Sequence, residues 1–166
     1  MSVIGLDLSS TSTGICHHDG HTTTIAPKGV LLHRARRMRS EATLATVAGE
    51  LVVIEAIATR HVQTAIAIAT VHALVLDAIA DTRHILMVSP ASLKKFATGK
   101  GNSNKTAMLL AAKRDGWIDP PGATDDQADA WWLWVLGHAT TGLWYVAETK
   151  YRTDVIASLK TSEAKP

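Results

Sequence analysis

The chain has 166 residues, which suits one domain with a core that needs no disulfide or structural metal. Hydrophobic residues make up 46% and charged residues 19% of it, and the net charge of +2 permits nucleic-acid binding without requiring it. The single cysteine, Cys16, excludes an intramolecular disulfide and suits a reducing cytosol. The first residues lack a basic segment and soon meet Asp7, so we expect no signal peptide. The longest apolar run, 64–80, is interrupted by His72 and Asp77, so we expect no membrane span and no membrane partner.

The first part of the chain predicts a three-stranded antiparallel meander. Residues 2–8 are apolar and end at a Ser/Thr run, as a buried strand does. Two further short strands are predicted over 14–18 and 22–26. They flank Asp19 and Gly20, a pair that favours the positive φ angles of a tight hairpin turn.

The middle of the chain alternates helices and strands. Residues 32–50 have apolar positions at helical spacing, and 51–54 form a β-branched run that predicts a central strand ending at Glu55. The Ala-rich helix predicted over 63–81 has little polar surface, so we expect it to be buried on more than one side, in a core or a dimer interface. Another buried strand is predicted over 84–88. A meander followed by strand–helix–strand crossovers predicts an α/β fold with a five-stranded mixed sheet and helices on both faces.

The last third is predicted to be mainly helical. A short helix at 90–96, a Gly-containing loop at 98–102, a helix at 103–114 capped by Ser103, and a final helix at about 125–140 are expected. After Tyr151 the chain becomes polar and Lys-rich, which predicts a loosely held tail. We therefore expect one domain over residues 1–150 and a polar tail over 151–166.

Four acidic residues stand where the ends of strands and helices should converge: Asp7, Glu55, Asp126 and Asp129. The last two are three residues apart and share a helical face. Carboxylate oxygens are the ligands that Mg²⁺ prefers, and such ions can activate water against a phosphodiester. Taken singly, each acid is more often a turn residue or a helix cap than a functional group, and either Asp125 or Asp126 suits the cap. Glu55 follows a buried run and so needs a partner or a metal.

Basic residues occur in two groups. Lys94, Lys95, Lys100 and Lys105 bracket the Gly-containing loop, and we expect them to contact DNA phosphates. The second group is Arg34, Arg36, Arg37 and Arg39, for which phosphate contact and a solvated helix face both remain open.

Two nucleotide-binding alternatives are disfavoured. The loop before Lys105 superficially resembles a phosphate-binding loop, but Asn104 stands where glycine is required and no strand leads into it. The residues from Asp7 to Thr11 also resemble the first phosphate loop of sugar kinases and actin-like ATPases, which need two such domains. We expect no nucleotide cofactor. The histidines around the hairpin turn predict a polar tip, and Trp131, Trp132 and Trp134 predict core packing.

Several motifs together resemble the RuvC Holliday-junction resolvases. The stretch 3–14, with Asp7 ending a strand and Thr13-Gly14 following, resembles the opening of that family. The run that ends at Glu55 resembles its strand-four glutamate. Residues 89–95 and 99–105 resemble its lysine-bearing segment that faces DNA, and 126–130 resemble its closing Asp-x-x-Asp-Ala helix. The matches follow the family order from about residue 3 to 140.

The resemblance implies an RNase H-like fold and a homodimer that cuts branched DNA, foremost four-way junctions, by hydrolysis. It implies a Mg²⁺ cofactor, with Mn²⁺ as a substitute, and a cytoplasmic location in a bacterium or a phage-infected host. The implied metal ligands and catalytic residues are Asp7, Glu55, Asp126 and Asp129. The implied DNA-binding residues are Lys94, Lys95, Lys100, Lys105 and Arg60.

Two departures from the family pattern bear on specificity. Leu8 and Ser9 stand where the family usually has Pro-Gly, and Ala58 stands where it often has a base-stacking aromatic residue. The second departure affects the expected cleavage-site preference rather than the metal chemistry. Two alternatives remain open: an RNase H-like nuclease of other specificity, for flaps, RNA–DNA hybrids or strand ends, and a catalytically silent junction-binding module.

Overall fold

A five-stranded mixed sheet forms the centre of the molecule. The computed structural model describes residues 1–58 and 61–163. The strands are β1 (Val3–Leu8), β2 (Thr13–Cys16), β3 (Thr22–Ile25), β4 (Leu51–Glu55) and β5 (His84–Val88). Their order in the sheet is β3-β2-β1-β4-β5. The first three strands are antiparallel, and β4 pairs in parallel with both β1 and β5. The predicted α/β fold, a meander followed by parallel strands, is confirmed.

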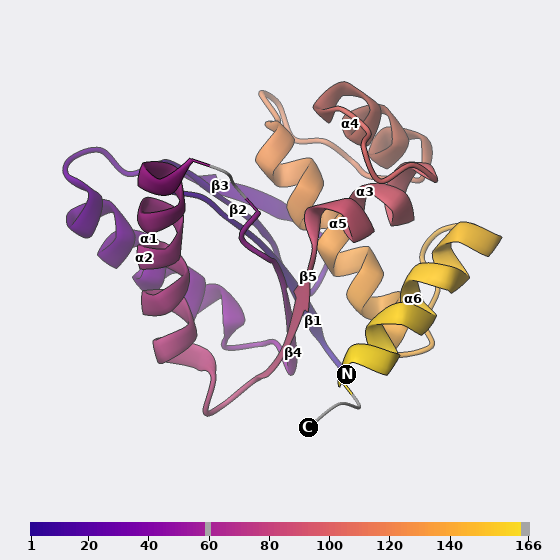
Figure 1. Ribbon diagram of the computed structural model, residues 1–166, viewed down its shortest axis with the longest axis horizontal. Helices are drawn as coiled ribbons and strands as arrows, with labels where there is room; N and C mark the ends of the chain where they lie inside the picture. Colours follow the sequence, from indigo (N-terminus) through magenta and orange to yellow (C-terminus); the bar gives the residue numbers. More distant parts are fainter. Residues whose placement is uncertain (59–60, 164–166) are drawn as a thin grey trace.

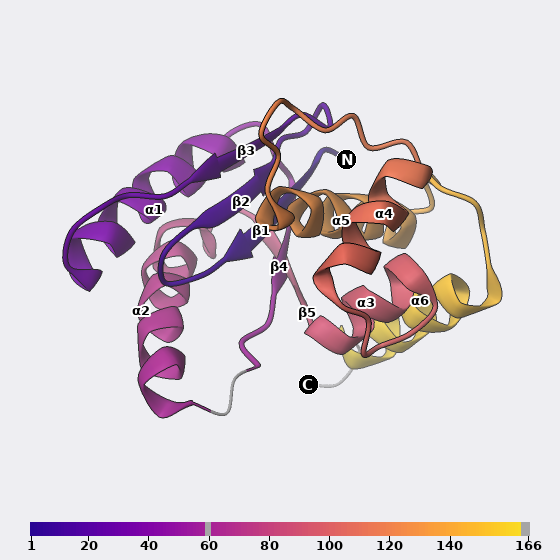
Figure 2. The same cartoon turned by 90° about the horizontal axis from the view of Figure 1, so that it is seen from above.

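Helices cover both faces of the sheet (Figure 1). One layer consists of α1 (Leu31–Thr46) and α2 (Val62–Ile79). The other consists of α3 (Pro90–Thr98), α4 (Lys105–Arg114), α5 (Asp125–Thr140) and α6 (Lys150–Glu163). Figure 2, a view from above, shows the strands lying between the two layers.

Strand alternation divides the hydrophobic core into two parts. Ile4 and Leu6 point to the α1–α2 side, whereas Val3 and Val53 point to the α5 side. Helix α5 is buried along nearly its whole length, which is why its sequence carries so few polar residues after the first turn. The three tryptophans of α5 are buried, as predicted, and the indole N–H of Trp132 donates to the Met108 carbonyl at 3.1 Å.

Helix α2 is more exposed than its sequence predicts. It buries Val71, Val75 and Ile79 against α1 and the sheet, but Val62 and Ile66 are 71% and 56% exposed. The prediction that this helix is buried on more than one side is wrong within the single chain. By length and composition α2 could also cross a membrane, so the expectation that no segment is long enough is wrong as well. One such helix is weak evidence for a membrane span, because the buried core helix of a soluble protein passes the same test.

The end of the chain is a helix rather than the predicted loose tail. Val155, Ile156 and Leu159 of α6 are buried in the core on the α5 side. Arg152 is 1% exposed, and it donates to the Asp115 carboxylate and to the Phe96 carbonyl. The spacing of Val155, Ile156 and Leu159 places them on one helical face, while Lys150, Thr153, Asp154 and Lys160 are exposed and give the segment its polar appearance.

The start of α4 also differs from the prediction. Its N-cap is Asn104, whose side chain accepts a hydrogen bond from the Ala107 amide at 2.9 Å. Ser103, the predicted cap, bonds instead to the Thr98 hydroxyl at 2.6 Å. The segment between α3 and α4 is thereby tied back to the end of α3.

Candidate active site

Asp7 and Glu55 stand beside each other at the carboxyl ends of neighbouring parallel strands. Leu6 pairs with Ile54 in the β1–β4 register, so the next residue of each strand lies at the same level. Because Val3 and Val53 face α5, alternation places Asp7 and Glu55 on that face as well. The first two predicted site residues are therefore brought together.

The start of α5 is fixed against the meander by its cap. Thr124 and Gln127 form a capping box, in which each side chain bonds to the backbone of the other residue. The Gln127 amide also donates to the Thr22 carbonyl at 3.2 Å, and the hydroxyls of Thr124 and Thr24 lie 3.0 Å apart. These bonds hold the start of α5 over the end of the sheet, with Asp126 in its first turn and Asp129 at the beginning of its second.

Two glycines allow α5 to approach the sheet closely. A Cβ atom on Gly5 would overlap the Ala130 carbonyl oxygen, and one on Gly14 would overlap the Asp126 carbonyl oxygen. Gly14 pairs with Asp7 in the β1–β2 register. The first turn of α5 is therefore pressed onto the sheet beside Asp7.

Burial and mutual repulsion raise the pKa values of three of these carboxyl groups. Burial raises the pKa of Asp7 well above its usual value, and Glu55, Asp129 and Asp126 raise it further. Burial raises the pKa of Glu55 to about 7, with repulsion by Asp129 adding to it. Burial also raises the pKa of Asp129 to about 6, against the attraction of Lys105. Ionised carboxylates this close repel one another, and a cation bound among them would remove that repulsion.

The donor set fits a hard divalent cation. All four groups offer carboxylate oxygens, and Asp129 Oδ1 is buried without a hydrogen-bond partner in the described part of the chain. Among residues 1–58 and 61–163, no three acidic, histidine or cysteine side chains are already gathered tightly enough to enclose an ion. The carboxylates thus face one another without forming a closed cage.

The two adjacent aspartates that open α5 have different partners. Asp125 forms an ion pair with the Lys105 ammonium, whereas Asp126 accepts a hydrogen bond from the Ser12 hydroxyl. Asp126, but not Asp125, is among the charges that raise the pKa of Asp7. The structure therefore favours Asp126 over Asp125 as the neighbour of Asp7, a choice that the sequence left open.

The predicted DNA-binding residues separate into two groups. Lys94 and Lys105 lower the pKa values of Glu55 and Asp129, so both lysines lie near the end of the sheet that carries these carboxylates. Lys95 and Lys100 lie on the same α3–α4 segment, but in the described residues neither is among the charges that act on these carboxylates. Arg60, the fifth predicted contact, lies outside the described residues.

Sequence reasoning missed Ser12. The hydroxyl of this residue bonds to a carboxylate 114 positions further along the chain, and periodicity does not report such a contact. The only signal was the Ser/Thr run after Asp7, in which Ser12 stands five residues beyond the first acid.

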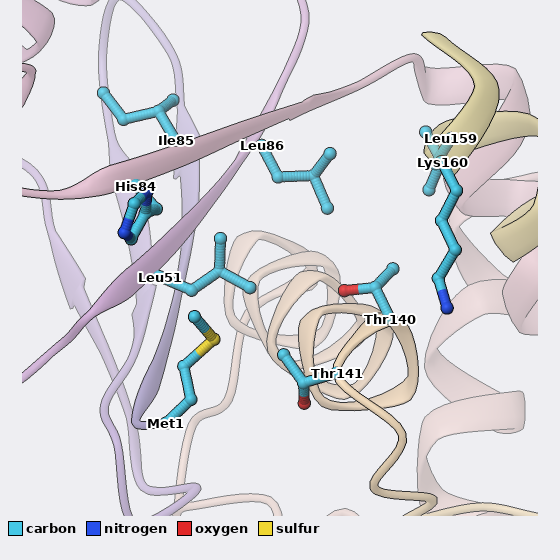
Figure 3. A pocket seen from close by; sticks show the side chains of 9 residues that line it. All are labelled: Met1, Leu51, His84, Ile85, Leu86, Thr140, Thr141, Leu159 and Lys160. Carbon is cyan, nitrogen blue, oxygen red and sulfur yellow. The ribbon is translucent and has the colours of Figure 1, made fainter. Parts of the chain in front are cut away.

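A separate hollow lies at the opposite end of the strands. It has a volume of about 450 Å³ and lies between the start of β4 and β5 and the end of α5 (Figure 3). Leu51, His84 and Thr140 are among its lining residues. Because the carboxylates stand at the other end of β1 and β4, this hollow is not part of the candidate site.

Comparison with known proteins identifies the fold. Neither a protein-family model nor a curated protein matches the chain. The structure of Thermus thermophilus RuvC aligns with a TM-score of 0.65 and 18% identity, covering 86% of this chain and 97% of that one. T. thermophilus RuvC in complex with a Holliday junction substrate aligns with a TM-score of 0.68 and 19% identity, covering 86% and 96%. The chain therefore has the fold of the RuvC resolvases, as its motifs predicted.

Proposed function

We propose that this chain, which has the fold of the RuvC resolvases, is a metal-dependent endonuclease that cuts branched DNA. The observation that carries the proposal is the convergence of Asp7, Glu55, Asp126 and Asp129 from β1, β4 and α5 at one edge of the sheet. A purely structural cluster would pair each buried carboxylate oxygen with a donor, yet Asp129 Oδ1 has no hydrogen-bond partner within the described residues. Clustered buried carboxylates with raised pKa values offer the oxygen ligands that a divalent cation prefers.

The four carboxylates are the proposed ligands of Mg²⁺, or of Mn²⁺ in its place. When bound, such ions lower the pKa of a coordinated water and offset the charge that develops on a phosphodiester. The chain's own contribution is to hold the ligands in position. The cap of α5 and the glycine contacts place Asp126 and Asp129, and the paired strands place Asp7 and Glu55.

The lysines are proposed to place the DNA backbone against this edge. Lys94 and Lys105 are near enough to influence the carboxylates, so a phosphate bound to them would lie beside the ligands. Lys95, Lys100 and Arg60 are proposed as further contacts along the same backbone. Ala58 in place of a stacking aromatic residue supports weak sequence preference at the cleaved position.

A homodimer is proposed, with α2 as the contact between protomers. The exposed side of α2 carries Val62 and Ile66, and the helix has a mean hydropathy of 1.7. A second copy of the chain would cover this face by two-fold symmetry. Two protomers would also supply two sites, as symmetric cutting of a four-way junction requires.

A panel of substrates tests the proposed specificity. Purified protein is incubated with Mg²⁺ or EDTA and with four labelled substrates: a four-way junction, a flap, an RNA–DNA hybrid and a single strand. We expect Mg²⁺-dependent cutting of the junction in preference to the others. Preferred cutting of the hybrid or the flap would assign the same site to another specificity. Tight junction binding without any cutting would instead identify a binding module.

A further inference from the structure

Arg34 of α1 holds the turn between β1 and β2 from the opposite side of the sheet. Its Nε donates to the Ser10 carbonyl at 3.0 Å, and its Nη1 donates to the Gly29 carbonyl at 2.5 Å. One guanidinium group thus joins the β1–β2 turn to the loop that leads into α1. With two of its nitrogens used on backbone oxygens, Arg34 differs from Arg36 and Arg37, which are exposed on the same helix.

The turn that Arg34 holds is internally fixed by Ser9. The Ser9 amide and hydroxyl both donate to the Ser12 carbonyl, at 3.0 Å and 2.8 Å. The Ser12 amide donates back to the Ser9 hydroxyl at 3.1 Å. A displacement of the Ser10 carbonyl is therefore transmitted to Ser12, because the four residues form one hydrogen-bonded unit.

Ser12 is the member of this turn that reaches the candidate active site. Its hydroxyl donates to Oδ2 of Asp126, a proposed metal ligand. This bond fixes the rotation of the carboxylate and leaves its other oxygen for a cation. An unbroken series of contacts thus runs from Arg34 through Ser10 and Ser12 to Asp126.

We propose that Arg34 is a positioning residue of the metal site, acting through Ser12 on Asp126. This inference rests on the proposed function, because it assumes that Asp126 binds a metal. The fork of the guanidinium suits the task, since a lysine ammonium at the same place cannot reach two carbonyls in fixed directions. Hydrogen bonds that orient metal ligands commonly change metal affinity by about 10-fold to 100-fold when they are removed.

The main competing role for Arg34 is a direct contact with a DNA phosphate. Arg34→Lys separates the two roles, because lysine keeps the positive charge but loses the paired hydrogen bonds. A phosphate contact through charge would survive this substitution and would not affect metal binding in the absence of DNA. A positioning role would be lost, and the loss would appear without DNA.

The test is a double-mutant cycle on Mn²⁺ affinity, measured without DNA by electron paramagnetic resonance of free Mn²⁺. Wild type, Arg34→Lys, Ser12→Ala and the double variant are compared, with Arg36→Lys as the matched control. Thermal unfolding in EDTA checks that each variant is folded. We expect each single substitution to weaken Mn²⁺ binding by about 10-fold and the double variant to bind like Ser12→Ala alone. The Arg36→Lys control should bind like wild type.

Two results would overturn the inference. Wild-type Mn²⁺ affinity in Arg34→Lys, or losses that multiply in the double variant, would show that Arg34 does not act through Ser12. In either case Mn²⁺ binding by the wild-type protein would leave the proposed nuclease site standing. Absence of Mn²⁺ binding by wild type would overturn the metal site itself and this inference with it.

Discussion

Gly14 lies against the carbonyl oxygen of Asp126, so closely that any side chain at position 14 would overlap it. Gly14 is also the register partner of Asp7. One glycine therefore sets the approach of a helix that carries two candidate ligands to a strand that carries a third.

Replacing this glycine should damage the site and the fold together. We expect Gly14→Ala to lower the free energy of unfolding by about 1–3 kcal/mol, because α5 must move away from the sheet. Moving α5 also separates Asp126 from Asp7, so Mn²⁺ affinity should fall by about 10-fold. Urea unfolding and Mn²⁺ titration measure the two effects.

Gly142→Ala is the matched control for this prediction. Gly142 has a φ of +91° and open space around it, so alanine there is destabilising through backbone strain alone. It follows the far end of α5 and should leave Mn²⁺ affinity unchanged. Equal losses of Mn²⁺ affinity in both variants would attribute the effect to general destabilisation rather than to the position of α5.

The contribution of Glu55 to the stability of the metal-free protein should fall as the pH rises from about 4 to 7, whereas His138, whose pKa burial lowers to about 4, acts in the opposite direction. The pKa of Glu55 is raised from 4.5 to about 7, so the native state holds a proton that the unfolded state has released in this range. A group of this kind stabilises the fold below its unfolded pKa, and that contribution is lost as the pH passes its folded pKa. Asp129, with a pKa of about 6, acts in the same direction.

Glu55→Gln isolates this effect from the other titrating groups. In EDTA at pH 8, we expect the variant to be more stable than wild type by about 1–3 kcal/mol, and at pH 4 the difference should vanish. Urea unfolding at pH 4 and pH 8 measures this difference in the free energy of unfolding. The stabilisation of wild type by Mg²⁺ should grow over the same pH range, because the ion binds the deprotonated groups. A difference that does not change with pH would contradict the assigned pKa of Glu55.

Lys94 and Lys105 should contribute to DNA binding through phosphate contacts. Each Lys→Gln substitution is expected to weaken junction binding and to reduce the slope of log K against log salt by about 0.9. Fluorescence anisotropy in EDTA over a range of salt concentrations measures both quantities. Lys160→Gln, beside the hollow at the opposite end of the strands, is the control and should leave the slope unchanged. Unchanged slopes for Lys94→Gln and Lys105→Gln would show that these lysines do not contact DNA phosphates.

The exposed side of α2 should determine the oligomeric state. Ile66→Lys places a charge at the centre of the apolar face, so we expect a dimer in wild type and a monomer in the variant by sedimentation velocity. Leu110→Lys, at a position with 61% exposure on α4, is the control and should remain dimeric. A monomeric wild type that cuts junctions fully would contradict the proposed dimer.

Much of the site could be predicted because its residues follow strong local patterns. The apolar runs before Asp7 and Glu55 predict buried strands, and parallel strands bring their carboxyl ends to one edge. Asp126 and Asp129 share a helical face by spacing alone. These patterns predict that Asp7, Glu55 and the start of the last helix meet, but they leave the choice between Asp125 and Asp126 open.

What could not be predicted depends on contacts between distant segments. The Ser12–Asp126 bond and the contact of Gly14 with α5 each join residues more than a hundred positions apart, and no local pattern encodes them. The burial of α6 was missed for a different reason, since only Val155, Ile156 and Leu159 form its apolar face and the other residues of the helix are mostly polar. The exposure of α2 depends on the packing of the whole fold, because only α1 shares its face of the sheet and no further element covers its outer side within the described residues.

Cutting of a labelled four-way junction by wild type, Asp7→Asn and Glu55→Gln tests the central claim most directly. Both substitutions keep the shape of the side chain and remove its charge, and unfolding in EDTA confirms that the variants are folded. We predict cutting by wild type in Mg²⁺ but not in EDTA, and a loss of more than about 100-fold in each variant, because the ligands supply several kcal/mol of transition-state stabilisation through the ion. Cutting that persists in EDTA, or wild-type rates in both variants, would contradict a metal-dependent nuclease built on these carboxylates.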